Sequence, residues 1–183
     1  AKTINLGLFY GMGKAKLQAE LGVSKDKAED LFAIYHQRVP FVKTLMKSVS
    51  NRAQQRGQIR TLLGRLCRFH LWEPNRFGIN KALPFEQAVQ EHGQGNIRRA
   101  YTYKALNKLI QGSAADMTKK SMLDLYKEGI IAHIQIHDEL DLSVESPEQA
   151  KKVVEIMENA VKLDVPNKVD YESGKNWGDI YDK

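Results

Sequence analysis

The sequence predicts an α+β fold, and three observations support that prediction. Apolar residues recur at helical spacing through most of residues 1–56, which makes the first third of the chain helical. A second, longer helical pattern covers residues 97–127. Apolar and polar residues alternate in the segment IIAHIQIHDELDLSVES, residues 130–146, and such alternation is typical of two half-buried strands.

Four helical segments are expected before residue 57, and each is bounded by residues that favour a helix start or stop. Glycine suits a helix C-terminus, serine caps an N-terminus, and proline is tolerated in the first turn. These boundary residues are Gly11, Gly13, Gly22, Ser24, Pro40 and Gly57. They predict helices over residues 1–10, 17–21, about 24–38 and about 40–57.

Beyond residue 57 the pattern changes to short strands and loops. Residues 58–71 predict a hairpin around Gly64 and Arg65. Residues 72–96 hold five glycines and prolines with little periodicity, so we expect a long loop there. The helix over residues 97–127 then stops at Gly129.

The C-terminal part is expected to hold a hairpin and a last helix. The two alternating strands would meet at a tight turn near Asp138 and Glu139, with their apolar residues on one face. Pro147 begins an amphipathic pattern that runs to about Leu163, and a short strand is expected around Val169.

Composition favours some functions over others. A formal charge of +6 and a pI near 9.3 favour an acidic partner such as nucleic acid, although many basic proteins bind none. The lone Cys67 excludes an internal disulfide, and no Cys/His cluster has zinc spacing. Without an apolar run of about 20 residues or an export signal, a cytoplasmic protein is expected. The chain starts at Ala1 within a helical pattern, so we expect a fragment.

The acidic pair Asp138-Glu139 is the strongest candidate for chemistry. A hairpin apex holds side chains rigidly, and a carboxylate held there can ligate Mg²⁺, which prefers oxygen ligands. Turn propensity alone also places Asp and Glu in turns, so the neighbouring motifs have to decide between the two interpretations.

Two helical patterns carry further candidates. Arg99, Tyr103, Asn107 and Gln111 recur every four residues and would form a polar stripe able to lie along a duplex, or simply a solvated helix face. In the opening helix Lys2, Leu6 and Tyr10 also recur every four residues, directly before Gly11. That face could meet a triphosphate, a sugar and a base, or could serve only for packing and capping.

Together and in this order, the motifs resemble those of family A DNA polymerases. AKTINLGLFYGMG is similar to the second half of the fingers-helix motif, ALNKLIQGSAAD to the palm helix motif, and IQIHDEL to the metal-site turn. TLLGR and the tail NWGDIY also resemble the family. The resemblance covers nearly the whole chain. It implies a partial right-hand polymerase fold, with residues 1–56 in the fingers and 57–183 in the palm.

The resemblance also implies roles for particular residues. Asp138 would be a catalytic metal ligand for Mg²⁺, with Glu139 nearby and His137 approaching the primer end. On the nucleotide side, Lys2 would contact the triphosphate of the incoming dNTP, and Tyr10 and Gly11 would lie at the template base. The residues expected along the primer-template DNA are Arg65, Arg99, Tyr103, Asn107 and Gln111.

Several positions depart from the family pattern. Leu6 stands where relatives usually have Phe or Tyr, so altered dideoxynucleotide acceptance is expected. Tyr103 stands where many relatives have a basic residue, and Arg98 or Arg99 could supply that contact. Residues 72–96 are expected to be longer than in the bacterial enzymes.

Two essential parts would lie upstream of Ala1, namely the first metal-binding Asp and the Arg that begins the fingers motif. The isolated chain is therefore expected to be inactive and to need the upstream part of the polymerase as a partner. Two alternatives stay open at this point: a fragment of a single-subunit RNA polymerase, against which QGSAAD argues, and a non-catalytic DNA-binding module.

Overall fold

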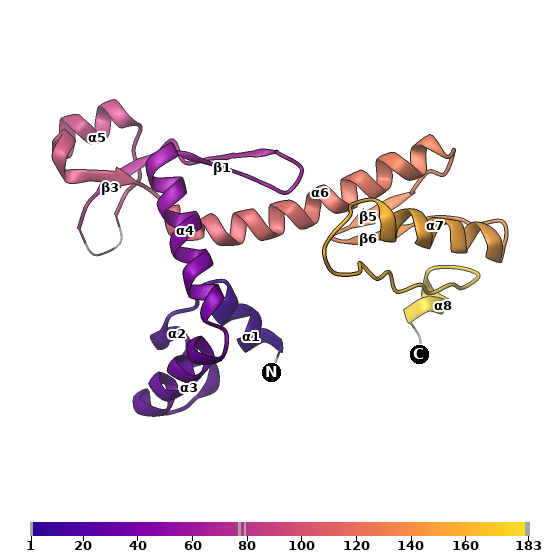
Figure 1. Cartoon of the computed structure of the whole chain (residues 1–183), viewed down its shortest axis with the longest axis horizontal. Coiled ribbons are helices and arrows are strands. Elements are labelled where there is room, and N and C mark those ends of the chain that lie inside the picture. The colour runs from indigo at the N-terminus through magenta and orange to yellow at the C-terminus, as the bar shows by residue number, and fades with distance from the viewer. Residues whose placement is uncertain (1, 77, 79, 182–183) are drawn as a thin grey trace. The chain divides into compact units, whose positions relative to one another are not determined.

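The computed structural model describes residues 2–76, 78 and 80–181 of the 183-residue chain. The chain divides into two compact units, Ala1–Gly112 and Ser113–Lys183. The described part consists of helices and three two-stranded antiparallel sheets, which confirms the predicted α+β class. Figure 1 follows these elements along the chain by colour.

Four helices begin the first unit, as predicted. They are α1 (Lys2–Phe9), α2 (Lys14–Leu21), α3 (Lys25–Arg38) and α4 (Pro40–Arg56). The Ser24 hydroxyl caps α3 by accepting a hydrogen bond from the backbone N–H of Lys27 at 3.3 Å. Gly57 ends α4 with a φ of 68°, in the left-handed region that glycine adopts easily. Local capping chemistry therefore sets these boundaries.

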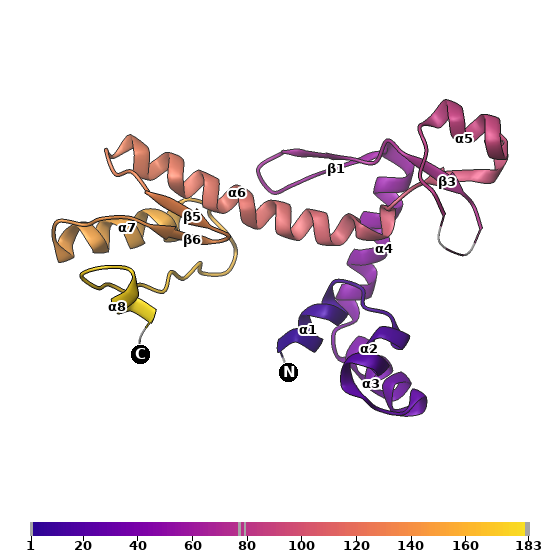
Figure 2. The same ribbon diagram turned by 180° about the vertical axis from the view of Figure 1, so that it is seen from behind.

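A hairpin follows α4 and packs on the core of the first unit. It pairs β1 (Gln58–Arg60) with β2 (Leu66–Arg68), which confirms the hairpin predicted around Gly64 and Arg65. The core joins α4, this hairpin and the start of α6 (Ala105–Lys127) through Val49, Ala53, Ile59, Phe69, Ala105 and Leu106. In both views α1, α2 and α3 gather at one end of α4, and β1 leaves from the other end (Figure 1 and Figure 2).

Residues 72–96, predicted as a long loop, contain regular structure instead. They hold β3 (Trp72–Pro74), α5 (Phe85–His92) and the 3-10 turn η1 (Gln94–Asn96). β3 pairs with β4 (Ile97–Arg99), and the rings of Trp72 and Phe85 lie 5.0 Å apart. The loop prediction was wrong because these contacts join residues that are distant in sequence, which local periodicity does not register.

The long helix begins later than predicted. Residues 97–99 form β4, the 3-10 turn η2 (Thr102–Lys104) follows, and α6 starts only at Ala105. Tyr101 has a φ of 61°, so a continuous helix from residue 97 is excluded. From Ala105 the helix continues to Lys127, the predicted end.

The second unit holds the end of α6, a hairpin and α7 (Pro147–Asn159). The hairpin pairs β5 (Ile134–Ile136) with β6 (Glu139–Asp141). The core of the second unit consists of the buried residues Leu125, Ile130 and Val153, and Leu140 and Leu142 of the hairpin pack against them. The last described helix is α8 (Gly178–Tyr181).

The alternation of apolar and polar residues predicted one apolar face shared by both strands of this hairpin. The observed register contradicts that prediction. Ile134 pairs with Asp141 and Ile136 with Glu139, and paired residues of an antiparallel sheet project to the same side. Leu140 and Leu142 therefore face the core, whereas Ile134 lies on the opposite side and is 42% exposed. The two-residue turn causes this inversion, since it places the apolar positions of the two strands out of phase.

The C-terminal tail also differs from its prediction. α7 ends at Asn159 instead of about Leu163, and the residues around Val169 form no strand within the described structure. The backbone N–H of Val169 donates to the Glu158 carboxylate at 3.2 Å, so a side chain takes the place of a neighbouring strand.

Candidate active site

The acidic pair lies at the apex of the β5–β6 hairpin. Because Ile136 pairs with Glu139, the turn itself consists of His137 and Asp138, and Glu139 is the first residue of β6. His137 has a φ of 53°, a left-handed conformation that few non-glycine residues adopt. The side-chain amide of Gln135 donates to the His137 carbonyl at 2.5 Å. The turn therefore holds Asp138 in an exposed position on a constrained backbone.

The hairpin beneath this apex is fixed to the rest of the second unit. Leu140 and Leu142 pack on the core around Leu125. At the far end of the sheet, the backbone N–H of His133 donates to the Asp141 carbonyl at 2.8 Å, and its ring Nε2 lies 3.1 Å from the Ser143 hydroxyl. A side chain at the apex is thus presented by a supported strand pair.

The chemistry of the apex suits a hard cation. Asp138 and Glu139 are both exposed and offer carboxylate oxygens, which Mg²⁺ prefers. In the part of the chain that the structure describes, no three His, Cys, Asp or Glu side chains come together as a metal site. The apex thus presents two adjacent carboxylates of the type that a hard cation prefers.

Asp141 is a third carboxylate of the hairpin that the sequence analysis did not single out. It lies on the same side of the sheet as Glu139 and opposite Ile134. Its Oδ2 atom is buried and has no hydrogen-bond partner among the described residues. In the sequence, Asp141 could be noticed only as a polar residue at an alternating position of a predicted strand. That its Oδ2 atom is buried without a partner among the described residues can be seen only in the folded structure.

The nucleotide-side candidates lie on α1 and in the turn that follows it, in the first unit. Leu6 is 44% exposed, Tyr10 is half-buried, and the rings of Phe9 and Tyr10 meet edge to face at 5.5 Å. Gly11 has a φ of 89°, so a side chain there would be strained. The backbone of Lys2 begins α1, and its side chain lies outside the described residues.

The turn of the β1–β2 hairpin is bound to α6. Arg65 Nη2 donates to the Gly112 carbonyl at 2.7 Å, and the Arg65 backbone N–H donates to the Thr61 hydroxyl at 3.0 Å. A Cβ atom on Gly112 would lie 2.9 Å from Thr61 Cγ2, so this approach requires glycine. Asn107 is half-buried and Gln111 exposed on the same helix, as two members of the predicted stripe.

Arg99, the first member of the predicted stripe, does not lie on that helix. It lies in β4, where its guanidinium packs over the Trp72 ring at 4.5 Å and donates to the Phe69 carbonyl at 2.9 Å and the Gln54 carbonyl at 3.2 Å. A Cβ on Gly57 would lie 2.7 Å from Arg99 Cζ. The stripe prediction was wrong for Arg99 because the chain forms a strand there, and its side chain ties β4 to the end of α4.

Tyr103 also precedes α6, since it belongs to the 3-10 turn η2. Its ring is 65% exposed. The helical stripe is thus reduced to Asn107 and Gln111.

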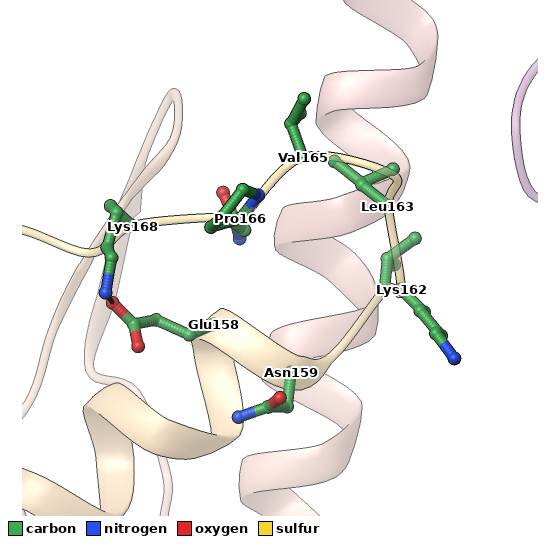
Figure 3. Close-up of a pocket in the computed structure, with 9 residues that line it drawn as sticks. Glu158, Asn159, Lys162, Leu163, Val165, Pro166 and Lys168 are labelled. Atoms are coloured by element: carbon green, nitrogen blue, oxygen red, sulfur yellow. Dashed lines mark ion pairs between the residues drawn. The ribbon is translucent and has the colours of Figure 1, made fainter.

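A shallow depression in the second unit is lined by residues at the end of α7 and just after it. Figure 3 shows the Glu158 carboxylate facing Lys168 across it, and the two charged groups lie 3.8 Å apart. None of the sequence-predicted residues lines this depression. Separately, none of the described helices is both long and apolar enough to span a membrane.

Comparisons with known proteins place these motifs in a family. The profile of DNA polymerase family A matches residues 1–179. The chain is 32% identical to a DNA-directed DNA polymerase of Pseudomonas phage M6 and 36% identical to DNA polymerase I of Bacillus caldotenax. These alignments cover 97% and 98% of this chain, but only 29% and 19% of the two relatives.

A solved structure agrees with the sequence comparisons. The POL domain of Pol1 from M. smegmatis, in complex with DNA primer-template and dNTP, matches with a TM-score of 0.68 and 29% sequence identity. The match covers 90% of this chain and 28% of that one. With the profile spanning nearly all of its residues, this chain belongs to DNA polymerase family A.

Proposed function

We propose that this chain is the C-terminal part of a DNA-directed DNA polymerase that performs template-directed deoxynucleotidyl transfer in the bacterial or phage-infected cytoplasm. The observation that carries the proposal is the exposed Asp138 on the constrained apex of a supported hairpin, in a chain of family A. In this proposal residues 1–56 belong to the fingers and residues 57–183 to the palm.

Asp138 would hold Mg²⁺, with Glu139 as a nearby, less essential carboxylate. A bound metal would supply Lewis-acid activation of the primer 3′-hydroxyl and charge stabilisation of the leaving pyrophosphate. The hairpin's part is to keep the Asp138 carboxylate in place, because its backbone is fixed by the His137 conformation and by the Leu140 contact beneath it. The remaining carboxylate ligands would come from the upstream part of the polymerase.

On the nucleotide side, Lys2 would contact the triphosphate and Tyr10 the position of the template base. Gly11 would let the template strand pass closely, which agrees with its left-handed backbone. Leu6 presents an exposed aliphatic side chain where an aromatic ring is usual in the family, so the sugar of the incoming nucleotide would lose a flat packing surface. Altered dideoxynucleotide acceptance follows, and Leu6→Phe in the complete enzyme should restore ordinary discrimination.

On the DNA side, Asn107 and Gln111 would track the duplex, and His137 would approach the primer end. Arg65 would take part through its exposed surface while it also binds Gly112. Arg99 receives a structural role here, because its guanidinium is engaged by Trp72 and two carbonyl oxygens.

The test is primer extension by the complete polymerase, made by joining this chain to its upstream part. Asp138→Ala should reduce extension on the order of a thousandfold or more. Asp170→Ala, at an exposed aspartate outside the hairpin, is the matched control and should leave the rate unchanged. Comparable rates for the two variants would refute the catalytic role and favour a DNA-binding module.

A second assay concerns the chain alone. Because it carries only some of the required metal ligands, the purified 183-residue protein should extend no primer. Measurable extension that disappears in Asp138→Ala would contradict the need for an upstream part.

A further inference from the structure

The carbonyl of His137, in the turn of the β5–β6 hairpin, accepts its hydrogen bond from a side chain. The amide nitrogen of Gln135 donates to it at 2.5 Å. Among the described residues, no backbone N–H donates to this carbonyl. The Gln135 amide therefore ties the first residue of the turn to the strand that leads into it.

This first turn residue has an unusual backbone conformation. His137 has a φ of 53°, whereas Asp138, the second residue of the turn, does not have a positive φ. A two-residue hairpin turn with a positive φ at its first position only usually has glycine there, because a Cβ atom is strained in that conformation. Histidine at this position therefore requires a contact that offsets the strain.

Gln135 supplies such a contact. It pairs with Leu140, and paired residues of an antiparallel sheet project to the same side. Its side chain is exposed and reaches the carbonyl two residues further along the chain. Without this donor, nothing among the described side chains bonds the His137 carbonyl, and the strained residue is free to relax to a negative φ. Asp138 follows directly, so its carboxylate would move with the turn.

We infer that Gln135 is a positioning residue for Asp138: its amide holds His137 in the left-handed conformation, and that conformation fixes where the Asp138 carboxylate lies. This inference rests on the proposed function, in which Asp138 acts in deoxynucleotidyl transfer. Gln135 acts through the backbone of the turn and not on the substrate. A direct contact of the Gln135 amide with DNA is the competing interpretation, and the experiments separate the two.

The first experiment measures primer extension by the complete polymerase carrying Gln135→Met. Methionine keeps the length of the side chain and removes the donor. The kcat should fall about tenfold or more, because a catalytic group is displaced, whereas the KM for the dNTP should stay at the parent value. Gln55→Met, at an exposed glutamine on α4, is the matched control and should leave kcat unchanged.

A double-mutant cycle tests how Gln135 acts. Glycine adopts the left-handed conformation without strain, so His137→Gly should make the Gln135 bond dispensable. Because His137→Gly alone can lower the rate, the effect of Gln135→Met is measured within each background. It should be about tenfold beside His137 and less than about twofold in the His137→Gly background. Equal losses in the two backgrounds would show a direct contact of Gln135 with DNA and would overturn the inference.

NMR of the 183-residue chain gives a readout that does not depend on activity. The one-bond coupling between Cα and Hα depends on the sign of φ, so it reports the conformation of His137 directly. The parent should show the coupling of a positive φ, and Gln135→Met should shift it toward that of a negative φ. An unchanged coupling in Gln135→Met would refute the hold of the amide on the turn.

The failure of this inference is distinct from that of the proposed function. If Asp138→Ala abolishes extension while Gln135→Met and Gln55→Met extend primers equally well, only the positioning role is refuted. If Asp138→Ala still extends primers while the His137 coupling shifts in Gln135→Met, the proposed function is refuted and only the hold of Gln135 on the turn remains.

Discussion

The two hairpins β1–β2 and β5–β6 use similar local structure for different purposes. Each is a short antiparallel pair with a charged residue at or near its turn. Arg65 in the first donates to the Gly112 carbonyl of α6, whereas Asp138 in the second is an exposed carboxylate on a constrained turn. A charged turn residue therefore serves packing in the first hairpin, where a helix carbonyl accepts its hydrogen bond, whereas in the second hairpin the charged group is exposed to solvent.

The contact between the first hairpin and α6 should be the most sensitive to change. In Gly112→Ala the new Cβ would lie 2.9 Å from Thr61 Cγ2, and Thr61 is buried. We expect a loss of about 1–3 kcal/mol in the free energy of unfolding, despite the better helix propensity of alanine. Chemical denaturation of the chain measures it.

A double variant provides the control for that prediction. Thr61→Ser removes Cγ2 and keeps the hydroxyl that accepts from the Arg65 N–H. Combined with Gly112→Ala it should recover most of the lost stability, as a coupled pair does. A Gly112→Ala protein as stable as the parent would mean that the hairpin and helix are not in close contact.

In the second hairpin, a substitution at Asp141 should raise the free energy of unfolding instead of lowering it. Asp141→Val removes a buried carboxylate oxygen that has no hydrogen-bond partner in the described part of the chain, and it places a β-branched residue in a strand. The free energy of unfolding of the chain should rise by about 1 kcal/mol. Asp141→Asn keeps a buried polar group and should bring no such gain; a destabilised Asp141→Val would indicate that Oδ2 has a donor.

A smaller loss of stability is expected when Arg65, the charged residue of the first hairpin, is replaced. Arg65→Met keeps the length of the side chain and removes the hydrogen bond to Gly112, so stability should fall by about 1 kcal/mol. Arg68→Met, at an exposed arginine of the same hairpin, should leave the unfolding midpoint unchanged. Equal midpoints for the two variants would remove the structural role of Arg65.

The smallest predicted effect lies in α3 and depends on pH. Burial, and then the positive charge of Lys43, lower the pKa of His36 below its ordinary value of 6.5. Its Nδ1 is buried and has no hydrogen-bond partner among the described residues. Since the folded state disfavours the charged ring, the stability that His36 contributes is present above about pH 6.5 and is lost as the pH falls below it.

The measurement is the thermal midpoint of the chain between about pH 7.5 and pH 5. His36→Gln should flatten the fall of the midpoint on acidification. His70→Gln, at an exposed histidine, should retain it. Parallel curves for all three proteins would show that His36 is not responsible.

The parts of the fold that the sequence predicted are those fixed by local chemistry. Ser24 caps α3, Pro40 begins α4 and Gly57 ends it, each by an interaction within one turn of the helix. The hairpin apex at Asp138 was also predicted to within one residue, because alternation and turn propensity both act locally. The family motifs then gave these residues a function.

What the sequence could not predict depends on distant contacts. Trp72 pairs with Arg99 across 26 intervening residues, so neither β4 nor the late start of α6 leaves a local pattern. The orphaned oxygen of Asp141 and the ring–lysine contacts of Tyr101 exist only once the chain is folded. Side-chain neighbours, more than element types, decide which polar residues serve structure.

The most direct test measures thermal unfolding and primer extension on the same two variants of the complete polymerase, Asp138→Asn and Gly112→Ala. We predict opposite losses: Asp138→Asn keeps the parent's melting temperature and loses extension on the order of a thousandfold, whereas Gly112→Ala melts earlier and retains most of its activity per folded molecule. An Asp138→Asn enzyme that melts as early as Gly112→Ala, or that extends primers at the parent rate, would contradict this prediction.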